Sequence, residues 1–428
     1  MQTHHESSSS LAPTDAPSGL AEIQQEWRQI LTPWWKATLA ILPTFLITRL
    51  LFLLLTYFGG VLFTITGSSS FALTFKSVLY GWYHWDTTRY LTIATQGYLS
   101  QDYTGFFPLY PTIVHTLSAL THQDVLLVGM LISNLAFLGA LVVFFRLMER
   151  EFDRATATRG VLYLSIFPTA LLFFAAYDVS LLLFCLLFCF YALRQNAWWL
   201  AGLFGGLAAL THPTGIFLFI VFLYEFSRQH VPSLQQAWRE RRIQAFTPFL
   251  SPLLAALCIP LGLLIYMYTL SRKFQDALAF LHPGEGTHAS TPWTAPLTTI
   301  QHIFKDPFYS FTTTHSLFEL SLFVFVCAML VLCFVGPAKL DKNQWAFPLF
   351  GLLVLIYSLF YPYLPATLIS QFDPFPSIQY TTLIIFSAFI ILARLGKAAW
   401  FHQTVLLLSL PMLAFLVLQL LKGYWALS

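Results

Sequence analysis

The stretch His84-Trp85-Asp86-Thr87-Thr88-Arg89-Tyr90 decides how the whole chain is interpreted. It places a carboxylate among aromatic rings in a polar loop, after the first long apolar run of the sequence. An ionisable side chain at a membrane boundary is costly to keep, and it therefore marks a functional site until shown otherwise. Asp86 is the first candidate for chemistry in this sequence.

Composition identifies the apolar runs around this loop as membrane spans. Of the 428 residues, 57% are hydrophobic and only 10% are charged, whereas a soluble domain carries about 25% charged residues. The 12 Trp and 19 Tyr suit the aromatic belts that lie at the two membrane surfaces. The net charge of +3 is small and dispersed, so it indicates no nucleic-acid partner. These numbers exclude a soluble globule.

The apolar runs predict an all-α polytopic membrane protein with about eleven transmembrane helices. They lie at about 37–58, 124–147, 160–177, 179–193, 197–211, 214–226, 247–270, 316–336, 345–361, 379–395 and 401–421. Several are shorter than the roughly 20 residues that a perpendicular helix needs, so they are expected to pair at a cavity or to begin in the interface. Residues 1–33 are expected to form a cytoplasmic tail with an interfacial helix, and 34–428 the membrane-embedded domain.

Positive charge predicts the orientation of the chain. With a cytoplasmic amino terminus, most of the 22 Lys and Arg residues fall in inside segments, as the positive-inside rule requires. Residues 106–120 must then not cross the bilayer, so an interfacial or re-entrant helix is expected there, started by Pro108 or Pro111. The long loops that lie outside are about 59–123, 271–315 and 362–378. The tips near Tyr177 and His212 also lie outside, so the candidate polar groups converge on one face.

Three blocks of sequence carry a family resemblance. The first is Trp85-Asp86-x-x-x-Tyr90-x-x-Ile93-Ala94-x-x-Gly97-Tyr98, followed by Phe106-Phe107-Pro108-Leu109-Tyr110-Pro111. The second is Phe167-Pro168-Thr169 with Tyr177 and Ser180-Leu181, and the third runs from Trp198-Trp199-Leu200-Ala201-Gly202 to Leu210-Thr211-His212-Pro213-Thr214-Gly215. In this order they resemble the GPI mannosyltransferase II family, specifically its bacterial relatives, within the C-type glycosyltransferase (GT-C) superfamily. The resemblance covers about residues 37–226 well and the remainder only by hydropathy.

This resemblance implies a glycosyltransferase of the GT-C fold that moves a sugar, typically mannose, from a polyprenyl-phosphate donor on the non-cytoplasmic side of the membrane. It also implies a multi-pass protein of the bacterial plasma membrane, with Asp86 as the catalytic carboxylate. A carboxylate within hydrogen-bond reach can accept the proton of an acceptor hydroxyl as that hydroxyl attacks the anomeric carbon. Inversion at that carbon follows. Glycan, lipid and protein acceptors all remain open.

The other candidate residues fall into two groups. The donor phosphate and sugar are expected to be held by Arg49, Arg89, His84, Trp85, Tyr90, His212, Gln379 and Tyr380. The cavity wall is expected to include Tyr98, Phe107, Tyr110, Tyr177 and Asp178. An arginine suits the phosphate because its planar fork binds two oxygens at once.

Several of these residues also have an ordinary structural interpretation. Asp86 could pair with Arg89 one helical turn away, and Arg49 could extend to the headgroups. Asp178 could cap the helix that follows it, and His212 could be a satisfied turn residue. Tyr110, like Phe107, could serve packing alone.

The chain departs from the family pattern at three positions. Val179 stands where the family usually has Glu, so the acid has either moved to Asp178 or lost its role. His212 and Gln379 stand where the family favours Arg. Either the donor or acceptor differs from the usual one, or catalytic efficiency has declined. A catalytically degenerate scaffold is therefore one alternative.

A transporter or flippase for lipid-linked sugars is the other alternative. It would favour inverted repeats and charged residues deep in several helices, whereas the predicted spans look bare apart from Arg49. No cofactor is expected. The outer loop holds His282, Glu285 and His288, but their spacing matches no established metal site, so a mobile loop over an acceptor groove is preferred.

Overall fold

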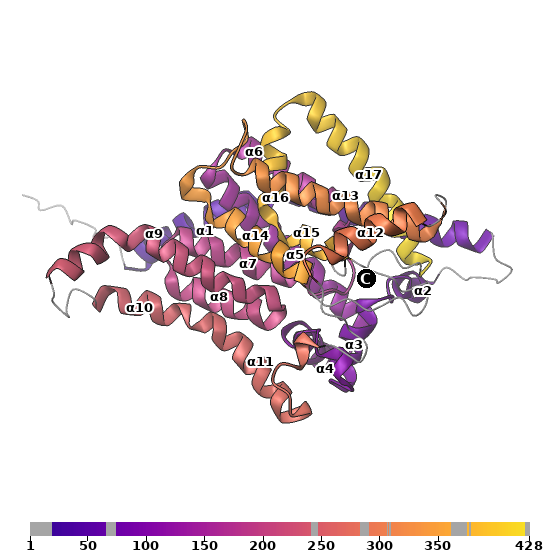
Figure 1. Cartoon of the computed structure of the whole chain (residues 1–428), viewed down its shortest axis with the longest axis horizontal. Coiled ribbons are helices and arrows are strands. Elements are labelled where there is room, and N and C mark those ends of the chain that lie inside the picture. Colours follow the sequence, from indigo (N-terminus) through magenta and orange to yellow (C-terminus); the bar gives the residue numbers. More distant parts are fainter. Residues whose placement is uncertain are drawn as a thin grey trace, which may run out of the picture.

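The computed structural model describes residues 19–65, 74–240, 247–282, 291–305, 307, 310–360, 375 and 378–423. Within these ranges the regular elements are all helices, as expected (Figure 1). Five helical segments are long and apolar enough to cross a membrane, and a sixth is a broken pair. The chain is an all-α polytopic membrane protein. Glu285 and His288, in the loop predicted to be mobile over an acceptor groove, lie outside the described residues.

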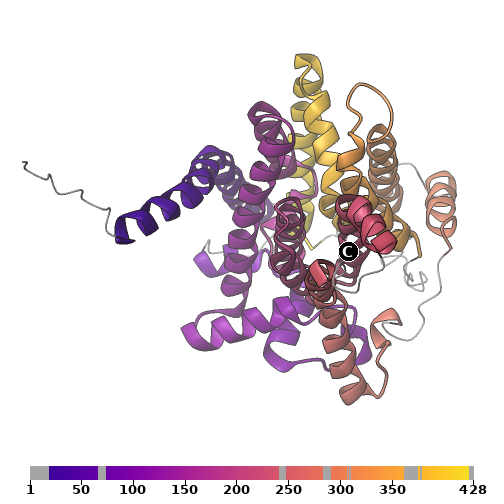
Figure 2. The same cartoon turned by 90° about the vertical axis from the view of Figure 1, so that its left-hand side faces the viewer.

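The long spans come from both ends and the middle of the chain. They belong to α1 (Gly19–Ile65), α5 (Val125–Glu151), α10 (Thr247–Ala256) with α11 (Cys258–Phe274), α13 (Phe311–Leu332) and α17 (Ala399–Leu421). The broken pair is α15 (Ile378–Ile384) and α16 (Phe386–Leu395), which meet at an angle of 67°. The first span continues without interruption from the predicted interfacial segment, and the beginning of α1 projects from the bundle (Figure 2).

Other helices lie between these spans along the chain. Four are short: α6 (Arg154–Ile166), α7 (Val179–Arg194), α8 (Trp198–Thr211) and α14 (Ala346–Phe360). The fifth, α9 (Phe217–Glu240), has 24 residues but does not qualify as a membrane span by length and composition. The 14 residues of α8 rise only about 21 Å, less than the roughly 30 Å of a bilayer core. Each of the eleven predicted apolar runs contains a helix, but several helices are too short to span alone. The run predicted at 160–177 was wrong as a single span, because α6 ends at Ile166 and the chain continues through a turn and the 3-10 segment Ala170–Phe173.

Glycine lets α8 approach its neighbours closely. A Cβ atom at Gly202 would meet the carbonyl oxygen of Ala255, and one at Gly206 would meet the carbonyl oxygen of Cys258. The two glycines are four residues apart, so they lie on one face of the helix. Small residues in this spacing allow membrane helices to pack backbone against backbone.

A group of short helices lies at one end of the molecule. They are α2 (Phe75–Tyr80), α3 (Asp86–Gln96), α4 (Leu109–Thr121) and α12 (Thr294–Lys305), all on the right in Figure 1. The predicted helix after Pro108 is α4, and its 13 residues rise about 20 Å, too little to cross the bilayer. Short 3-10 helices also punctuate the connections: η1 (Gln101–Tyr103), η2 (Ala170–Phe173), η3 (Pro213–Ile216), η5 (Ala279–Leu281) and η6 (Lys342–Gln344).

An ionic network joins the carboxyl-terminal ends of α5 and α7 to the first half of α9. Arg194 binds Glu151 through two hydrogen bonds of 2.6 and 2.7 Å. Glu225, which is fully buried, lies 3.5 Å from Arg194 and 2.6 Å from Arg228. Gln344 of η6 donates to Glu151 at 3.2 Å. Because the two carboxylates share Arg194, the network fixes three helices relative to one another.

Candidate active site

The site begins with a strained residue. Trp85 has φ 56° and ψ −131°, and α3 starts immediately after it at Asp86. A positive φ is uncommon for a residue other than glycine, and it persists where the surrounding structure enforces it. Thr88 closes the turn by donating to the carbonyl oxygen of Trp85 from its backbone nitrogen at 2.9 Å and from its hydroxyl at 2.7 Å. The half-buried Asp86 side chain is therefore set at the first turn of a helix.

A second carboxylate lies close to Asp86. Asp178 precedes α7 and is fully buried, and neither of its carboxylate oxygens has a hydrogen-bond partner of good geometry among the described residues. Burial raises the pKa of Asp178 to about 7, the nearby hydroxyls of Tyr90 and Tyr380 oppose this rise, and the charge of Asp86 adds to it. At neutral pH the Asp178 carboxyl is therefore protonated in a large fraction of molecules.

Tyrosine hydroxyls surround the two carboxylates. The ring centroids of Tyr90 and Tyr177 are 6.3 Å apart, and the ring planes are inclined at 61°. Burial raises the pKa of both tyrosines well above the usual value, and the charges of Asp86 and Asp178 add to the rise. Both hydroxyls therefore remain protonated and can donate hydrogen bonds.

His212 brings an imidazole to the same place. Its ring stacks on Tyr380, with centroids 4.8 Å apart. Nδ1 accepts the backbone N–H of Thr214 at 3.3 Å and lies 2.8 Å from the Thr214 hydroxyl. Burial lowers the pKa of His212 to about 3, so the ring is neutral and the hydrogen-bond pattern assigns its proton to Nε2. His212 can donate a hydrogen bond but cannot replace the charge of an arginine.

Four separate segments therefore converge: α3, the connection from η2 to α7, the connection from α8 to η3, and α15. Gln379, next to Tyr380 on α15, is also buried, and its backbone carbonyl accepts the Thr169 hydroxyl at 3.4 Å. Of the predicted site residues, the structure brings together Asp86, Tyr90, Tyr177, Asp178, His212, Gln379 and Tyr380. Trp85 adjoins them through the backbone.

The two predicted phosphate-binding arginines are placed differently. Arg49 is only 8% exposed and donates to Asn134 Oδ1 at 2.7 Å and to the carbonyl oxygen of Phe173 at 3.3 Å. Four phenylalanine rings lie 4.9 to 5.6 Å from its guanidinium carbon. Arg89 is exposed and lies over the rings of Tyr103 and Phe106. Arg49 therefore does not extend to the headgroups, and Arg89 points to the loop η1 rather than into the tyrosine group.

Three of the predicted cavity-wall residues make structural contacts. The Tyr98 hydroxyl donates to the Phe106 carbonyl at 2.7 Å, and Phe107 packs on Tyr266 with centroids 4.5 Å apart. Tyr110 is fully buried and donates to the Gly129 carbonyl at 2.9 Å. These contacts hold α3 and α4 against α5 and α11. His84 instead lies at the edge, where a Cβ atom on Gly423 would be 3.3 Å from its ring.

Two kinds of residue were missed from the sequence. Thr214 fixes the His212 ring, and Ser133 donates to the Tyr177 carbonyl at 2.7 Å, yet single hydroxyls in apolar runs carry no distinctive signal. The expectation that the spans are bare apart from Arg49 is wrong. Glu319 of α13 is fully buried, and its carboxylate lies 3.0 Å from His315 Nε2. A Glu four residues after a His at the start of an apolar run was the available signal.

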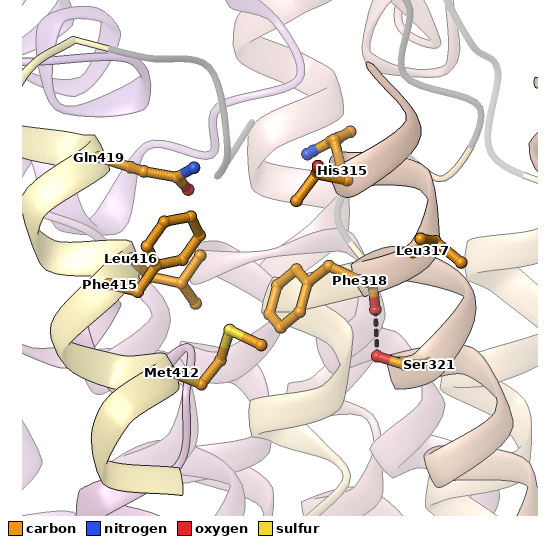
Figure 3. Close-up of a pocket in the computed structure, with 9 residues that line it drawn as sticks. His315, Leu317, Phe318, Ser321, Met412, Phe415, Leu416 and Gln419 are labelled. Atoms are coloured by element: carbon orange, nitrogen blue, oxygen red, sulfur yellow. Dashed lines mark hydrogen bonds between the residues drawn. The ribbon is translucent and has the colours of Figure 1, made fainter. Parts of the chain in front are cut away.

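A cavity of about 240 Å³ opens between α13 and α17. Figure 3 shows Gln419 and His315 facing each other across one end of it. Phe318 and Met412 lie away from that pair, and most of the other lining side chains are apolar. A mostly apolar lining with two polar side chains at one end suits an apolar group that carries a polar end.

No family of known proteins and no curated protein matches the sequence. Solved structures do resemble it. ArnT from Cupriavidus metallidurans, bound to undecaprenyl phosphate, is 11% identical with a TM-score of 0.43, and the match covers 79% of this chain and 70% of ArnT. The oligosaccharyltransferase AglB from Archaeoglobus fulgidus, in complex with an inhibitory peptide and a dolichol-phosphate, is 12% identical with a TM-score of 0.43. That match covers 90% of this chain and 56% of AglB, so the chain spans little more than half of the archaeal protein.

Proposed function

We propose that this protein is a glycosyltransferase of the GT-C type that uses a sugar carried on a polyprenyl phosphate, with Asp86 as general base. The supporting observation is the convergence of Asp86 and Asp178 with Tyr90, Tyr380 and a neutral His212, contributed by separate segments. Buried carboxylates with perturbed pKa values gather at functional sites more often than in structural cores. The family resemblance of the segment around Asp86 points to the same chemistry.

The two carboxyl groups can assist the two partners of a nucleophilic displacement at the anomeric carbon: Asp86 assists the attacking acceptor, and Asp178 the donor. Asp86 accepts the proton of the acceptor hydroxyl while the hydroxyl oxygen bonds to the anomeric carbon. The bond between that carbon and the phosphate oxygen breaks, and polyprenyl phosphate leaves with the electron pair. Asp178, protonated in part at neutral pH, donates a hydrogen bond to the donor. A direct displacement of this kind inverts the anomeric configuration.

The donor is proposed to lie between the cavity and the carboxylates. Its prenyl chain occupies the apolar slot between α13 and α17, whose polar end lies toward the terminus of α17. A Cβ atom on Gly423, just beyond that terminus, would lie 3.3 Å from the ring of His84, two residues before Asp86. Hydrogen bonds from His212, Gln379 and Tyr380 hold the sugar and phosphate, and Arg89 screens the phosphate charge from the rim. Arg49 is proposed to support the site indirectly, by its hydrogen bond to the carbonyl oxygen of Phe173, rather than by contacting the donor.

The finer assignments belong to the same proposal. The sugar is mannose, and the acceptor is a glycan, lipid or protein hydroxyl. The site faces away from the cytoplasm of a bacterial cell, with the protein in the plasma membrane and its amino terminus inside, because most Lys and Arg residues then lie on the cytoplasmic side. No metal is required by this mechanism.

The buried pair His315–Glu319 favours a second candidate function. Ionisable groups inside a membrane helix are typical of transporters, so a flippase for lipid-linked sugars is the alternative. A transporter moves its cargo unchanged, whereas the proposed enzyme releases free polyprenyl phosphate. A degenerate scaffold would do neither.

The test measures that release. We expect the purified chain in liposomes to consume mannosyl polyprenyl phosphate when a suitable acceptor is present. Asp86→Asn should lower turnover by 10²-fold or more, on the order of what general base catalysis contributes. Asp102→Asn is the matched control, because Asp102 is an exposed carboxylate in the same outer loop. Undiminished turnover in Asp86→Asn would refute the assignment of the base, and sugar translocation without cleavage would favour the flippase.

A further inference from the structure

A second pocket gathers cations at the opposite end of α5 from the active site. Ser133, in the first half of α5, contacts the Tyr177 carbonyl, whereas Arg146 and Glu149 lie near the end of this 27-residue helix. A helix of that length rises about 40 Å. The pocket has a volume of about 190 Å³ and is lined by Thr32, Pro33, Lys36, Ala37, Phe145, Arg146, Glu149 and Arg154.

The charges of the pocket do not balance. Lys36, Arg146 and Arg154 face a single carboxylate, Glu149, which pairs with Arg146 at 2.9 Å. The neighbouring Asp153 does not line the pocket, and its carboxylate accepts the backbone N–H of Thr156 at 2.9 Å and the Thr156 hydroxyl at 2.6 Å. The residues that line the open space therefore carry two positive charges in excess.

One donor in the pocket has no partner. Arg146 Nε is buried and lacks a hydrogen-bond partner among the described residues. The guanidinium carbon of Arg146 also lies 5.8 Å from the centroid of the Trp34 ring. A buried N–H without an acceptor is costly, and an anionic oxygen in the pocket would satisfy it.

The pocket lies at the level of a membrane surface. The first apolar span starts at Leu31, within one residue of Thr32 in the pocket wall. Trp35, between pocket residues on α1, is 63% exposed, and Leu31 and Leu39 are exposed beside it. Exposed Trp next to cations is typical of the headgroup region, where indole rings settle.

We propose that this pocket binds the phosphate group of an anionic membrane phospholipid. The phosphate oxygens accept from Arg146 and Arg154, the Lys36 ammonium neutralises the remaining charge, and the acyl chains extend along the exposed apolar face of α1. Basic pockets between membrane helices recognise anionic headgroups in this way. A free phosphate compound shares the headgroup chemistry but would gain nothing from the apolar face. This site is independent of the proposed transfer reaction.

The test is a titration of the purified, delipidated chain with phosphatidylglycerol in a neutral detergent, followed by native mass spectrometry. We expect saturable binding that weakens with salt, and weaker binding of phosphatidylcholine and of inorganic phosphate. Arg154→Gln and Lys36→Gln should each weaken phosphatidylglycerol binding about five-fold, as expected for one interfacial cation. Arg154→Lys, which keeps the charge, should retain most of the affinity.

Arg150→Gln is the matched control. Arg150 is exposed on the same end of α5 but does not line the pocket, so its removal should leave the affinity unchanged. An equal loss in Arg150→Gln and Arg154→Gln would show a diffuse surface effect and overturn the proposal. Equal affinity for phosphatidylcholine would overturn it as well. Equal affinity for inorganic phosphate would identify a soluble phosphate ligand and overturn the lipid assignment.

Discussion

At the scale of single residues, the main feature is that the Asp178 carboxyl group is buried without enough hydrogen bonds or opposite charge to stabilise its ionised form. It is fully buried, and its pKa is raised from 3.8 to about 7. Between pH 3.8 and about 7, Asp178 therefore binds a proton more strongly in the folded state than in the unfolded state. Its contribution to stability is complete below about pH 4 and is lost as the pH rises through 7.

This linkage predicts a pH-dependent effect of Asp178→Asn. The variant removes the titrating group, so its free energy of unfolding relative to the wild type should rise between pH 4 and 8 by a few kcal/mol. Thermal unfolding in nanodiscs at several pH values measures the difference. The exposed Asp102→Asn serves as the control and should show no such trend. A pH-independent difference for Asp178→Asn would contradict the raised pKa.

At the scale of the elements, close contact of α8 with α10 and α11 positions the turn that contains His212. Gly202 and Gly206 allow this contact because side chains there would meet backbone carbonyls of Ala255 and Cys258. Backbone atoms cannot rotate away as side chains do. The η3 turn that follows α8 then carries His212 and Thr214 to the carboxylates.

We therefore expect Gly202→Ala to separate α8 from α10. Overpacking of this kind costs about 1–3 kcal/mol of stability, and it should also lower turnover because the His212 ring shifts. Leu203→Ala is the control on the same helix, because Leu203 is 51% exposed and is therefore not packed tightly against a neighbouring helix. Unfolding and turnover measured together test the idea, and a Gly202→Ala protein with both properties unchanged would show that the helices have room to spare.

These elements also show what a sequence can predict. The apolar runs and the helix after Pro108 were predictable, because hydropathy and proline act locally. The 67° break between α15 and α16 was not, because no proline or glycine marks it. Two of the phenylalanines around Arg49, Phe45 and Phe52, lie within one helical turn of it, but Phe137 and Phe174 come from distant segments, which periodicity cannot reveal. The positive φ of Trp85 likewise has no signal in the sequence. The gathering of Asp86, Asp178 and Tyr380 was predicted only because their loops were assigned to one side.

At the scale of the whole molecule, the ionic network around Arg194 joins α5, α7 and α9. It lies at the opposite end of α7 from Asp178. Glu225 is fully buried between Arg194 and Arg228. Removing one partner of a buried ion pair leaves an uncompensated charge and costs about 3–5 kcal/mol. The network therefore contributes to holding the bundle together as one body.

Glu225→Gln should accordingly lower the free energy of unfolding by about 3 kcal/mol, with little dependence on salt, because buried pairs are poorly screened. Glu149→Gln is the comparison, since the Arg146–Glu149 pair has a carboxylate side chain that is 29% exposed and should contribute about 1 kcal/mol or less. Thermal unfolding in nanodiscs at low and high salt distinguishes them. Similar losses in both variants would contradict a special role for the buried pair.

The end of the last helix and the segment before Asp86 are neighbours at one point. A Cβ atom on Gly423, just after α17, would lie 3.3 Å from the His84 ring, so any larger residue at this position would press on that ring. Gly423 also has φ 70°, a conformation that residues other than glycine rarely adopt. A side chain at position 423 is therefore disfavoured twice, by its own backbone and by the imidazole two residues before Asp86.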